Sequence, residues 1–226
     1  MNSQLPQELR QDTFYCLLCQ LAERPEVKTI LEIGASVGAG STEAFVAGLR
    51  SQPAGSKQLF TLEVNPDRFA DLEWRYAQEP YVQAFNVSSV GPEAYASEAE
   101  VAAFLKRNAD RLYLPPQKVL LAWRRQCLER TSHSGVPTDG IRIVQHLTGL
   151  DCFDLVLIDG SEFTGRAELE LLYGAQYLCL DDILAFKNHD NYLRLLADPE
   201  YTLIARDVML RHGFAVFQWN GPEGLL

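Results

Sequence analysis

Short hydrophobic runs recur along the chain, and most of them end in glycine or another turn-forming residue. Runs of this length without strict alternation are typical of strands that are buried on both faces of a sheet. Between them lie segments whose apolar residues recur at helical spacing. The pattern predicts strands over 28–34, 58–64, 82–89, 153–160, 177–183, 201–207 and 213–219.

Predicted helices alternate with these strands. They cover 7–22, 41–50, 67–78, 166–175 and, after a loop, the end of 187–198. Alternation of this kind predicts an α/β fold, with a doubly wound, mostly parallel, seven-stranded Rossmann-like sheet. The short link around Arg211 and Gly213 predicts a hairpin, which would put one antiparallel strand at the end of the sheet.

The segment 91–150 interrupts the alternation. It reads as helices over 92–110, 116–133 and 139–150, and it is too long for a single crossover connection. We therefore expect a helical insertion within one domain that spans residues 1–226, a length suited to a single buried core.

Charge and composition exclude several classes of protein. The formal net charge of −10 disfavours nucleic acid as a bulk substrate, because phosphate binding needs a basic surface. Neither a membrane-spanning apolar run nor a signal peptide is evident, so we expect a cytoplasmic protein that does not bind membranes. Five cysteines argue against a disulfide framework, and Cys16 and Cys19 are predicted to be core positions of one helix.

One stretch of this acidic chain is basic. Seven cationic residues lie between 106 and 130, and they could form a lid that recognises an anionic acceptor. The alternatives are solvated outer faces of two amphipathic helices, or docking against a second subunit in a homo-oligomer. The seven residues are Lys106, Arg107, Arg111, Lys118, Arg124, Arg125 and Arg130.

The segment 30–42, ILEIGASVGAGST, is the sharpest chemical signal. A buried strand runs through a small-residue turn into the start of a helix, where free N–H groups and the helix dipole suit a nucleotide-like ligand. The dinucleotide fingerprint would need glycine where Ser36 and Ala39 stand. An NAD-dependent oxidoreductase is therefore the weaker reading of this turn.

Polar residues also end the next strands. Glu63 can accept hydrogen bonds from both hydroxyls of a ribose, and Asn86 can contact an adenine edge together with Ser88 and Ser89. The alternatives are that Glu63 is an exposed surface carboxylate and that Asn86 is an ordinary polar residue at a strand end.

Three carboxylates should meet at the same edge of the sheet. Asp159 ends the fourth predicted strand, and Asp181 and Asp182 end the fifth. Lys187 and His189 follow, and either is a candidate general base, Lys187 only if its pKa is lowered. The alternatives are helix caps for the acids and exposed loop positions for the bases.

In order and spacing these motifs resemble class I S-adenosylmethionine (SAM)-dependent methyltransferases, although Ser36 replaces the middle glycine of the first motif. The resemblance implies that Glu32 holds the ammonium of SAM. It also implies an oxygen-ligated Mg²⁺ on Asp159, Asp181 and Asp182, as in the catechol and macrocin types of O-methyltransferase. The implied SAM-binding residues are Glu32, Gly34, Ser36, Gly38, Gly40, Ser41, Glu63, Asn86 and Asp159, and the implied catalytic residues are Asp159, Lys187 and His189.

The resemblance implies methyl transfer to an oxygen, in preference to a nitrogen, of a small polar molecule such as a sugar or secondary metabolite. Two alternatives stay open. One is an NAD-dependent oxidoreductase, and the other is a protein of the same fold that binds a nucleoside or a partner without catalysis.

Overall fold

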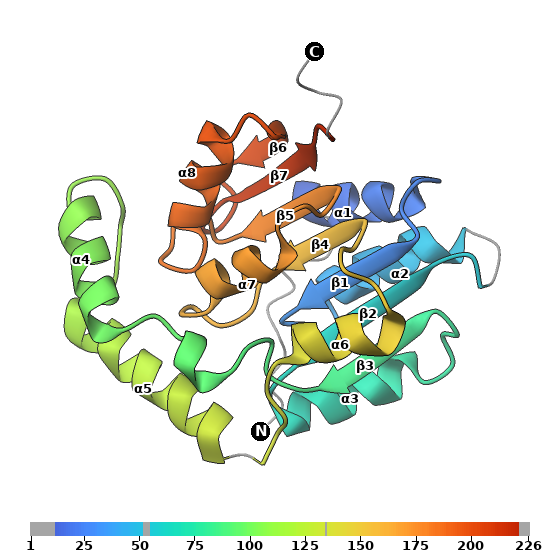
Figure 1. Cartoon of the computed structure of the whole chain (residues 1–226), viewed down its shortest axis with the longest axis horizontal. Helices are drawn as coiled ribbons and strands as arrows, with labels where there is room; N and C mark the ends of the chain where they lie inside the picture. Colours follow the sequence, from blue (N-terminus) through green and yellow to red (C-terminus); the bar gives the residue numbers. More distant parts are fainter. Residues whose placement is uncertain (1–11, 52–54, 134, 222–226) are drawn as a thin grey trace.

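The computed structural model describes residues 12–51, 55–133 and 135–221, and its centre is a seven-stranded sheet in the order β3-β2-β1-β4-β5-β7-β6 (Figure 1). The first five strands are parallel, and β7 runs antiparallel to both of its neighbours. The predicted α/β class is confirmed. The strands are β1 (Thr29–Ile33), β2 (Gln58–Glu63), β3 (Val82–Asn86), β4 (Leu155–Ile158), β5 (Tyr177–Asp181), β6 (Tyr201–Asp207) and β7 (Phe214–Trp219).

The closing hairpin forms, but its position corrects the expectation. The antiparallel strand β7 lies between β5 and β6, so β6 is the edge strand. Phe217 shows both pairings, with Leu178 of β5 and with Leu203 of β6. The first four residues of β7 are buried, whereas buried and accessible positions alternate along β6. The more apolar strand thus takes the interior position.

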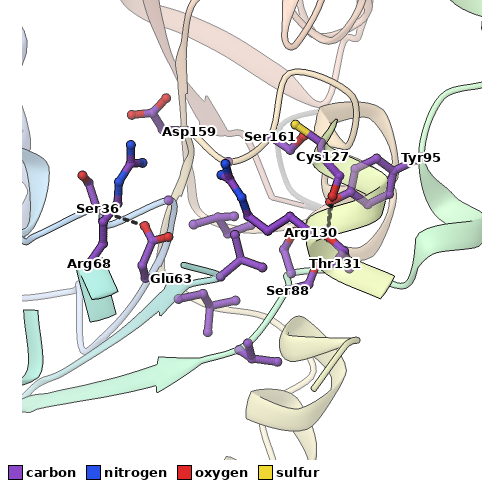
Figure 2. A pocket seen from close by; sticks show the side chains of 17 residues that line it. Ser36, Glu63, Arg68, Ser88, Tyr95, Cys127, Arg130, Thr131, Asp159 and Ser161 are labelled. Carbon is purple, nitrogen blue, oxygen red and sulfur yellow. Dashed lines mark hydrogen bonds between the residues drawn. The ribbon is translucent and has the colours of Figure 1, made fainter. Parts of the chain in front are cut away.

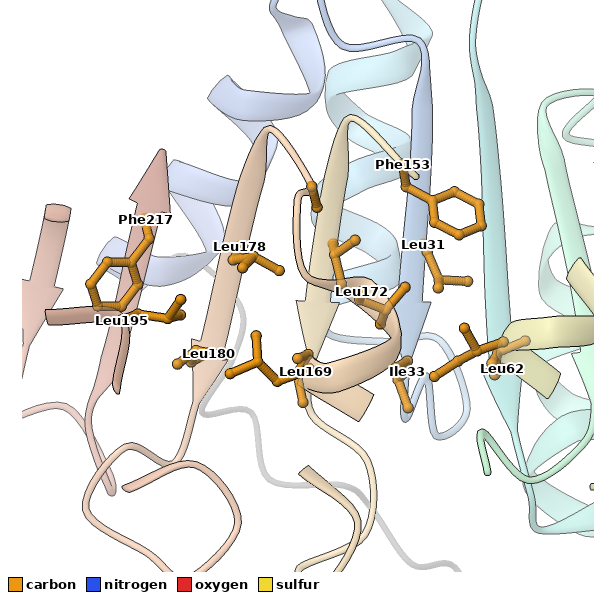
Figure 3. Packing of buried hydrophobic residues seen from close by; sticks show 14 of the residues in the cluster. Leu31, Ile33, Leu62, Phe153, Leu169, Leu172, Leu178, Leu180, Leu195 and Phe217 are labelled. Atoms are coloured by element: carbon orange, nitrogen blue, oxygen red, sulfur yellow. The ribbon is translucent and has the colours of Figure 1, made fainter. Parts of the chain in front are cut away.

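Helices cover both faces of the sheet. Alternate residues of β1 serve the two layers: Ile30 packs with α1 and α2, whereas Leu31 and Ile33 pack with α6 and α7 on the other face (Figure 3). None of the described helices is long and apolar enough to cross a membrane. The covering helices are α1 (Thr13–Glu23), α2 (Ser41–Arg50), α3 (Pro66–Tyr76), α6 (Gly140–Thr148), α7 (Gly165–Leu172) and α8 (His189–Ala197).

The two cysteines of α1 are not core positions as predicted. Cys16 is exposed and Cys19 is only partly buried. Phe14, Leu18 and Leu21 form the buried stripe of α1 instead, because they share the helix face that meets the sheet. The part of the predicted first helix before residue 12 lies outside the described residues.

The segment between β3 and β4 divides into two parts. Helix α6 packs on the sheet through Ile141 and Val144, like the other crossover helices. The helices α4 (Glu98–Asn108) and α5 (Gln117–His133), preceded by the short 3₁₀ turn η2 (Pro92–Ala94), extend away from the sheet (Figure 1). They enclose a small apolar cluster of their own, which includes Val101 and Leu120.

Candidate functional site

A cavity of about 180 Å³ lies at the carboxyl ends of the central strands, between the sheet and α5 (Figure 2). Gly34, which follows β1, and Asp159, which follows β4, both line it. Between β1 and β4 the order of the strands reverses, and open α/β sheets bind ligands at such a point. The polar lining residues are Ser36, Glu63, Arg68, Ser88, Ser89, Tyr95, Arg130, Thr131, Asp159 and Ser161.

The turn after β1 depends on glycine for packing. Gly34 has a φ of +92°, and a Cβ there would lie 2.2 Å from the carbonyl oxygen of Asp159. Gly38 has a φ of +74°, and its Cβ would meet the ring of Tyr76 at 2.6 Å. Gly34 and Ser36 line the cavity, whereas Gly38, Gly40 and Ser41 are not among its lining residues. These last three shape the turn and the start of α2.

Glu32 differs most from its predicted role. Its side chain is fully buried, and burial raises its pKa. Its carboxylate accepts hydrogen bonds from the hydroxyls of Ser41 (2.5 Å), Thr42 (2.7 Å) and Thr61 (2.7 Å). The predicted direct contact with a ligand ammonium is therefore not available in this geometry. Glu32 ties β1 to β2 and to the start of α2.

Glu63 is held at the cavity wall by main-chain donors. Its two carboxylate oxygens accept hydrogen bonds from the N–H groups of Ser36 (2.8 Å) and Asn65 (2.7 Å). A carboxylate has about four acceptor positions, so further donors can still bind on the cavity side. Asn86 donates to the carbonyl of Glu63 (2.7 Å) and ties β3 to β2, and it is Ser88 and Ser89 that reach the cavity.

Lys187 lies between two of the predicted metal ligands. Its Nζ is 2.6 Å from Asp159 Oδ1 and 2.7 Å from Asp182 Oδ2, and its side chain is only 6% exposed. Burial alone would lower the pKa of Lys187, but the two carboxylates raise it well above its ordinary value. The geometry therefore favours the charged form of the amine, and a role of Lys187 as a general base stays a prediction without support from this arrangement.

The third carboxylate has a cationic partner too. Arg211 Nη2 lies 3.4 Å from Asp181 Oδ2, and Arg211 also pairs with Asp12. Burial raises the pKa of Asp181 to about 7 and that of Asp159 to about 6. For Asp182 the ammonium of Lys187 outweighs burial and lowers the pKa.

The predicted Mg²⁺ site on these three aspartates is not supported. Among the described residues, no group of His, Cys, Asp or Glu has the arrangement of a metal site. Lys187 and Arg211 already form ion pairs with the three carboxylates that would bind the ion. The residues present do not fit the metal.

His189 does not reach the cavity either. It is the first residue of α8, it is buried, and its Nδ1 lies 2.9 Å from the carbonyl oxygen of Ile183. Its ring packs edge-on against Phe104 of α4 at 5.9 Å. His189 is not a lining residue, so its predicted role as a general base has no support from the geometry.

Helices α3 and α5 also supply cavity residues, of which Arg130 alone belongs to the predicted basic stretch. Arg68 comes from α3, and Cys127, Arg130 and Thr131 come from α5. The hydroxyl oxygens of Tyr95 and Thr131 are 2.9 Å apart and join η2 to α5. Of the seven basic residues at 106–130, all within the described chain, Arg130 alone lines this cavity. The place of the insertion, directly after a strand that ends at the site, is the signal that could have found Cys127 and Thr131.

Comparison with known proteins places this geometry in a known fold. No family model matches the sequence, and no curated protein matches it. An O-methyltransferase from Bacillus cereus in complex with SAH matches 95% of this chain and 84% of its own, with a TM-score of 0.53 and 15% identity. A methyltransferase from Geobacter sulfurreducens matches 92% and 80%, with a TM-score of 0.54 and 12% identity. The chain has a methyltransferase fold.

Within the methyltransferase fold, two kinds of residue surround the cavity. Main chain and small side chains near Gly34 form its floor, and side chains of α5 form the opposite wall. Figure 2 shows Arg130 extending from α5 toward the side of the cavity that holds Glu63 and Asp159. The arrangement brings two carboxylates and two guanidinium groups to one space, which suits a ligand that carries charges of both signs.

Proposed function

We propose that this chain is a SAM-dependent methyltransferase that acts on a small polar acceptor, at an oxygen in preference to a nitrogen. The observation that carries the proposal is the cavity at the β1–β4 switch point, with Glu63 fixed on its wall. The net charge of −10 favours a small molecule over a nucleic acid. A sugar or a secondary metabolite is the acceptor class that we expect.

The residues of the cavity fit the parts of SAM. Glu63 is suited to bind the ribose hydroxyls, and Ser88 and Ser89 are suited to bind the adenine edge. Because Glu32 is enclosed, Asp159 is the carboxylate left to bind the ammonium, together with the backbone near Ser36. Arg68 is the candidate partner of the amino-acid carboxylate.

The chain's own contribution to methyl transfer would be orientation. When bound, SAM supplies an electrophilic methyl group on a sulfonium. The transfer is an in-line displacement, so the protein must hold the acceptor oxygen in line with the methyl group. Asp159 is the predicted catalytic residue that lines the cavity, and by binding the ammonium it would fix the position of the sulfonium relative to the acceptor.

The rival ligand NAD fits less well. Ser36 and Ala39 stand where the dinucleotide turn needs glycine, and Arg130 extends into the space between the walls. Isothermal titration with SAM, S-adenosylhomocysteine (SAH) and NAD separates the two proposals. We expect SAM and SAH to bind in the micromolar range and NAD not to bind, and the reverse order would overturn the proposal.

A protein that binds SAM without catalysis is the remaining alternative. Incubation with isotope-labelled SAM and a panel of hydroxyl- and amine-bearing acceptors tests it. We expect a labelled product for at least one hydroxyl acceptor. Tight SAH binding without any product across sugars, phenols and amines would favour the non-catalytic protein.

A further inference from the structure

The carboxyl ends of β4 and β5 hold a cationic side chain in the place where the family resemblance implied a metal ion. The Nζ of Lys187 is within hydrogen-bond distance of one oxygen of Asp159 and one of Asp182. Both aspartates belong to the predicted metal-binding triad, and they come from different strands. A single ammonium therefore bridges the two strand ends, as a ligated cation would.

The backbone at Lys187 is fixed independently of these ion pairs. The next residue, Asn188, is fully buried and donates to the carbonyls of Ile158 (2.9 Å) and Asp181 (2.7 Å), the last residues of β4 and β5. On the other side, a Cβ at Gly165 would lie 2.2 Å from the carbonyl oxygen of Lys187. The position of the main chain thus places the Lys187 side chain between the two aspartates. The first residue of α7 packs tightly against the main chain of Lys187.

A divalent ion and this ammonium cannot share the site. A charged lysine has three donors and no acceptor, so it cannot become a ligand of the ion. A divalent ion bound to the same carboxylate oxygens would lie close to the ammonium, and two cations that close together in a buried site repel strongly. Arg211 adds a second positive charge beside Asp181. Metal binding would require Lys187 to leave a pocket in which its side chain is 6% exposed.

We propose that Lys187 is a built-in cation that replaces the divalent ion of related sites. It orients Asp159 toward the cavity, neutralises Asp182, and makes methyl transfer by this chain independent of divalent metal. The part concerning transfer rests on the proposed function, whereas the occupancy of the cation place is tested without any cofactor.

The test is Mn²⁺ binding to the full chain, followed by electron paramagnetic resonance in the absence of SAM. The parent should bind Mn²⁺ only weakly, without stoichiometry. Lys187→Ala should bind one Mn²⁺ per chain, about tenfold more tightly or better, and adding Asp182→Asn should abolish that binding. Lys187→Arg, which keeps the charge, should behave as the parent does.

Two results would overturn the proposal. The first is a parent protein that binds one Mn²⁺ tightly and loses it on Asp182→Asn, because Lys187 would then yield to the ion. The second is a folded Lys187→Ala protein that binds no Mn²⁺, because the carboxylates would then not form a place for a cation. Lys118→Ala, which removes an exposed lysine of α5, is the matched control.

Lys187→Gln keeps the proposal testable if Lys187→Ala does not fold, since the neutral amide can still donate to the aspartates. Mn²⁺ should raise the melting temperature of Lys187→Gln and leave that of the parent unchanged. Parent turnover should be the same in EDTA as in Mg²⁺, and loss of turnover in EDTA would contradict the transfer part. A parallel SAH titration distinguishes this failure from failure of the proposed function, because a protein that does not bind SAH can still give the Mn²⁺ result.

Discussion

Two groups of acids lie along the same edge of the sheet, and their partners differ. On the β1–β2 side, Glu32 and Glu63 are satisfied by hydroxyls and main-chain N–H groups. On the β4–β5 side, Asp159 and Asp182 are satisfied by the ammonium of Lys187. Neutral donors fix the position of a carboxylate without neutralising its charge, whereas a cation does both. Within the first group, Glu63 at the cavity wall therefore suits ligand recognition, whereas the second group suits charge balance.

The largest expected effect comes from removing the cation of the second group. Lys187→Ala leaves two partly buried carboxylates without their ammonium partner, so the free energy of unfolding should fall by about 3–5 kcal/mol. Urea denaturation measures it. Lys118→Ala should change stability by less than about 0.5 kcal/mol, since it alters an exposed surface position. Equal values for the two variants would mean that the β4–β5 acids do not depend on Lys187.

Removing the buried acid of the first group should cost less. Glu32→Ala leaves the hydroxyls of Ser41, Thr42 and Thr61 without their acceptor, and the free energy of unfolding should fall by about 2–4 kcal/mol. Glu32→Gln, which keeps an acceptor oxygen, should bind SAH with nearly the parent affinity. A large loss of SAH affinity in Glu32→Gln with unchanged stability would restore direct ligand contact by Glu32.

The other acid of the first group should act on binding instead of stability. Glu63→Ala removes charged hydrogen bonds to a ribose, which weakens SAH binding roughly ten- to a hundredfold, or about 1.5–3 kcal/mol. Isothermal titration measures this change. Glu73→Ala, on the exposed face of α3, is the control and should leave affinity unchanged. Parent-like affinity in Glu63→Ala would mean that the ribose is held elsewhere.

Replacing Arg130 with the opposite charge should have a smaller effect, because Arg130 is largely exposed. If the acceptor is anionic, Arg130→Glu should raise its KM by about two- to tenfold, and high salt should reduce the difference. Arg125→Glu, an exposed residue of α5 that does not line the cavity, is the control. A fall in SAH affinity without a change in acceptor KM would assign Arg130 to the carboxylate of SAM.

The last prediction concerns the dependence of stability on pH. Burial raises the pKa of Asp181 to about 7, so in the pH window from about 4 to 7 the folded chain holds a proton that the unfolded chain has released. The contribution of Asp181 to the free energy of unfolding is fully present below pH 4, and it is lost as the pH rises toward 7. Unfolding followed at pH 5, 6 and 7 should show a shallower decline for Asp181→Asn than for the parent, and identical slopes would refute the assignment. The charged groups around Asp181 are Asp159, Asp182, Lys187 and Arg211.

The sequence predicted the sheet and the strand ends well, because buried apolar runs that stop at an acid or a glycine carry that information locally. Glu63 and Asp159 reached the cavity as expected from their strand-end positions. The partners of the acids were not predictable in this way. Whether Glu32 faces a ligand or three hydroxyls depends on the packing of α2 and β2, which a local pattern does not contain.

Lys187 and His189 show the same limit. Both follow β5 at the edge where ligands bind, and spacing alone made each a candidate base. The direction of each side chain depends on Asn188, whose amide fixes the backbone between them onto two strands. The Lys187 side chain then contacts Asp159 and Asp182, and the His189 ring packs against Phe104 of α4. A basic lid from the insertion was predicted, but which of its residues line the cavity was not, because an insertion has no strand register that fixes its position.

The close packing around Gly34 limits how the site can change in evolution. Because only 2.2 Å would separate a Cβ at this position from the Asp159 carbonyl, Gly34 admits no substitution without a shift of β1 relative to β4. The opposite wall, with Cys127, Arg130 and Thr131 on α5, has no such constraint. New acceptor preferences should therefore arise by mutation of α5, while the floor is inherited unchanged.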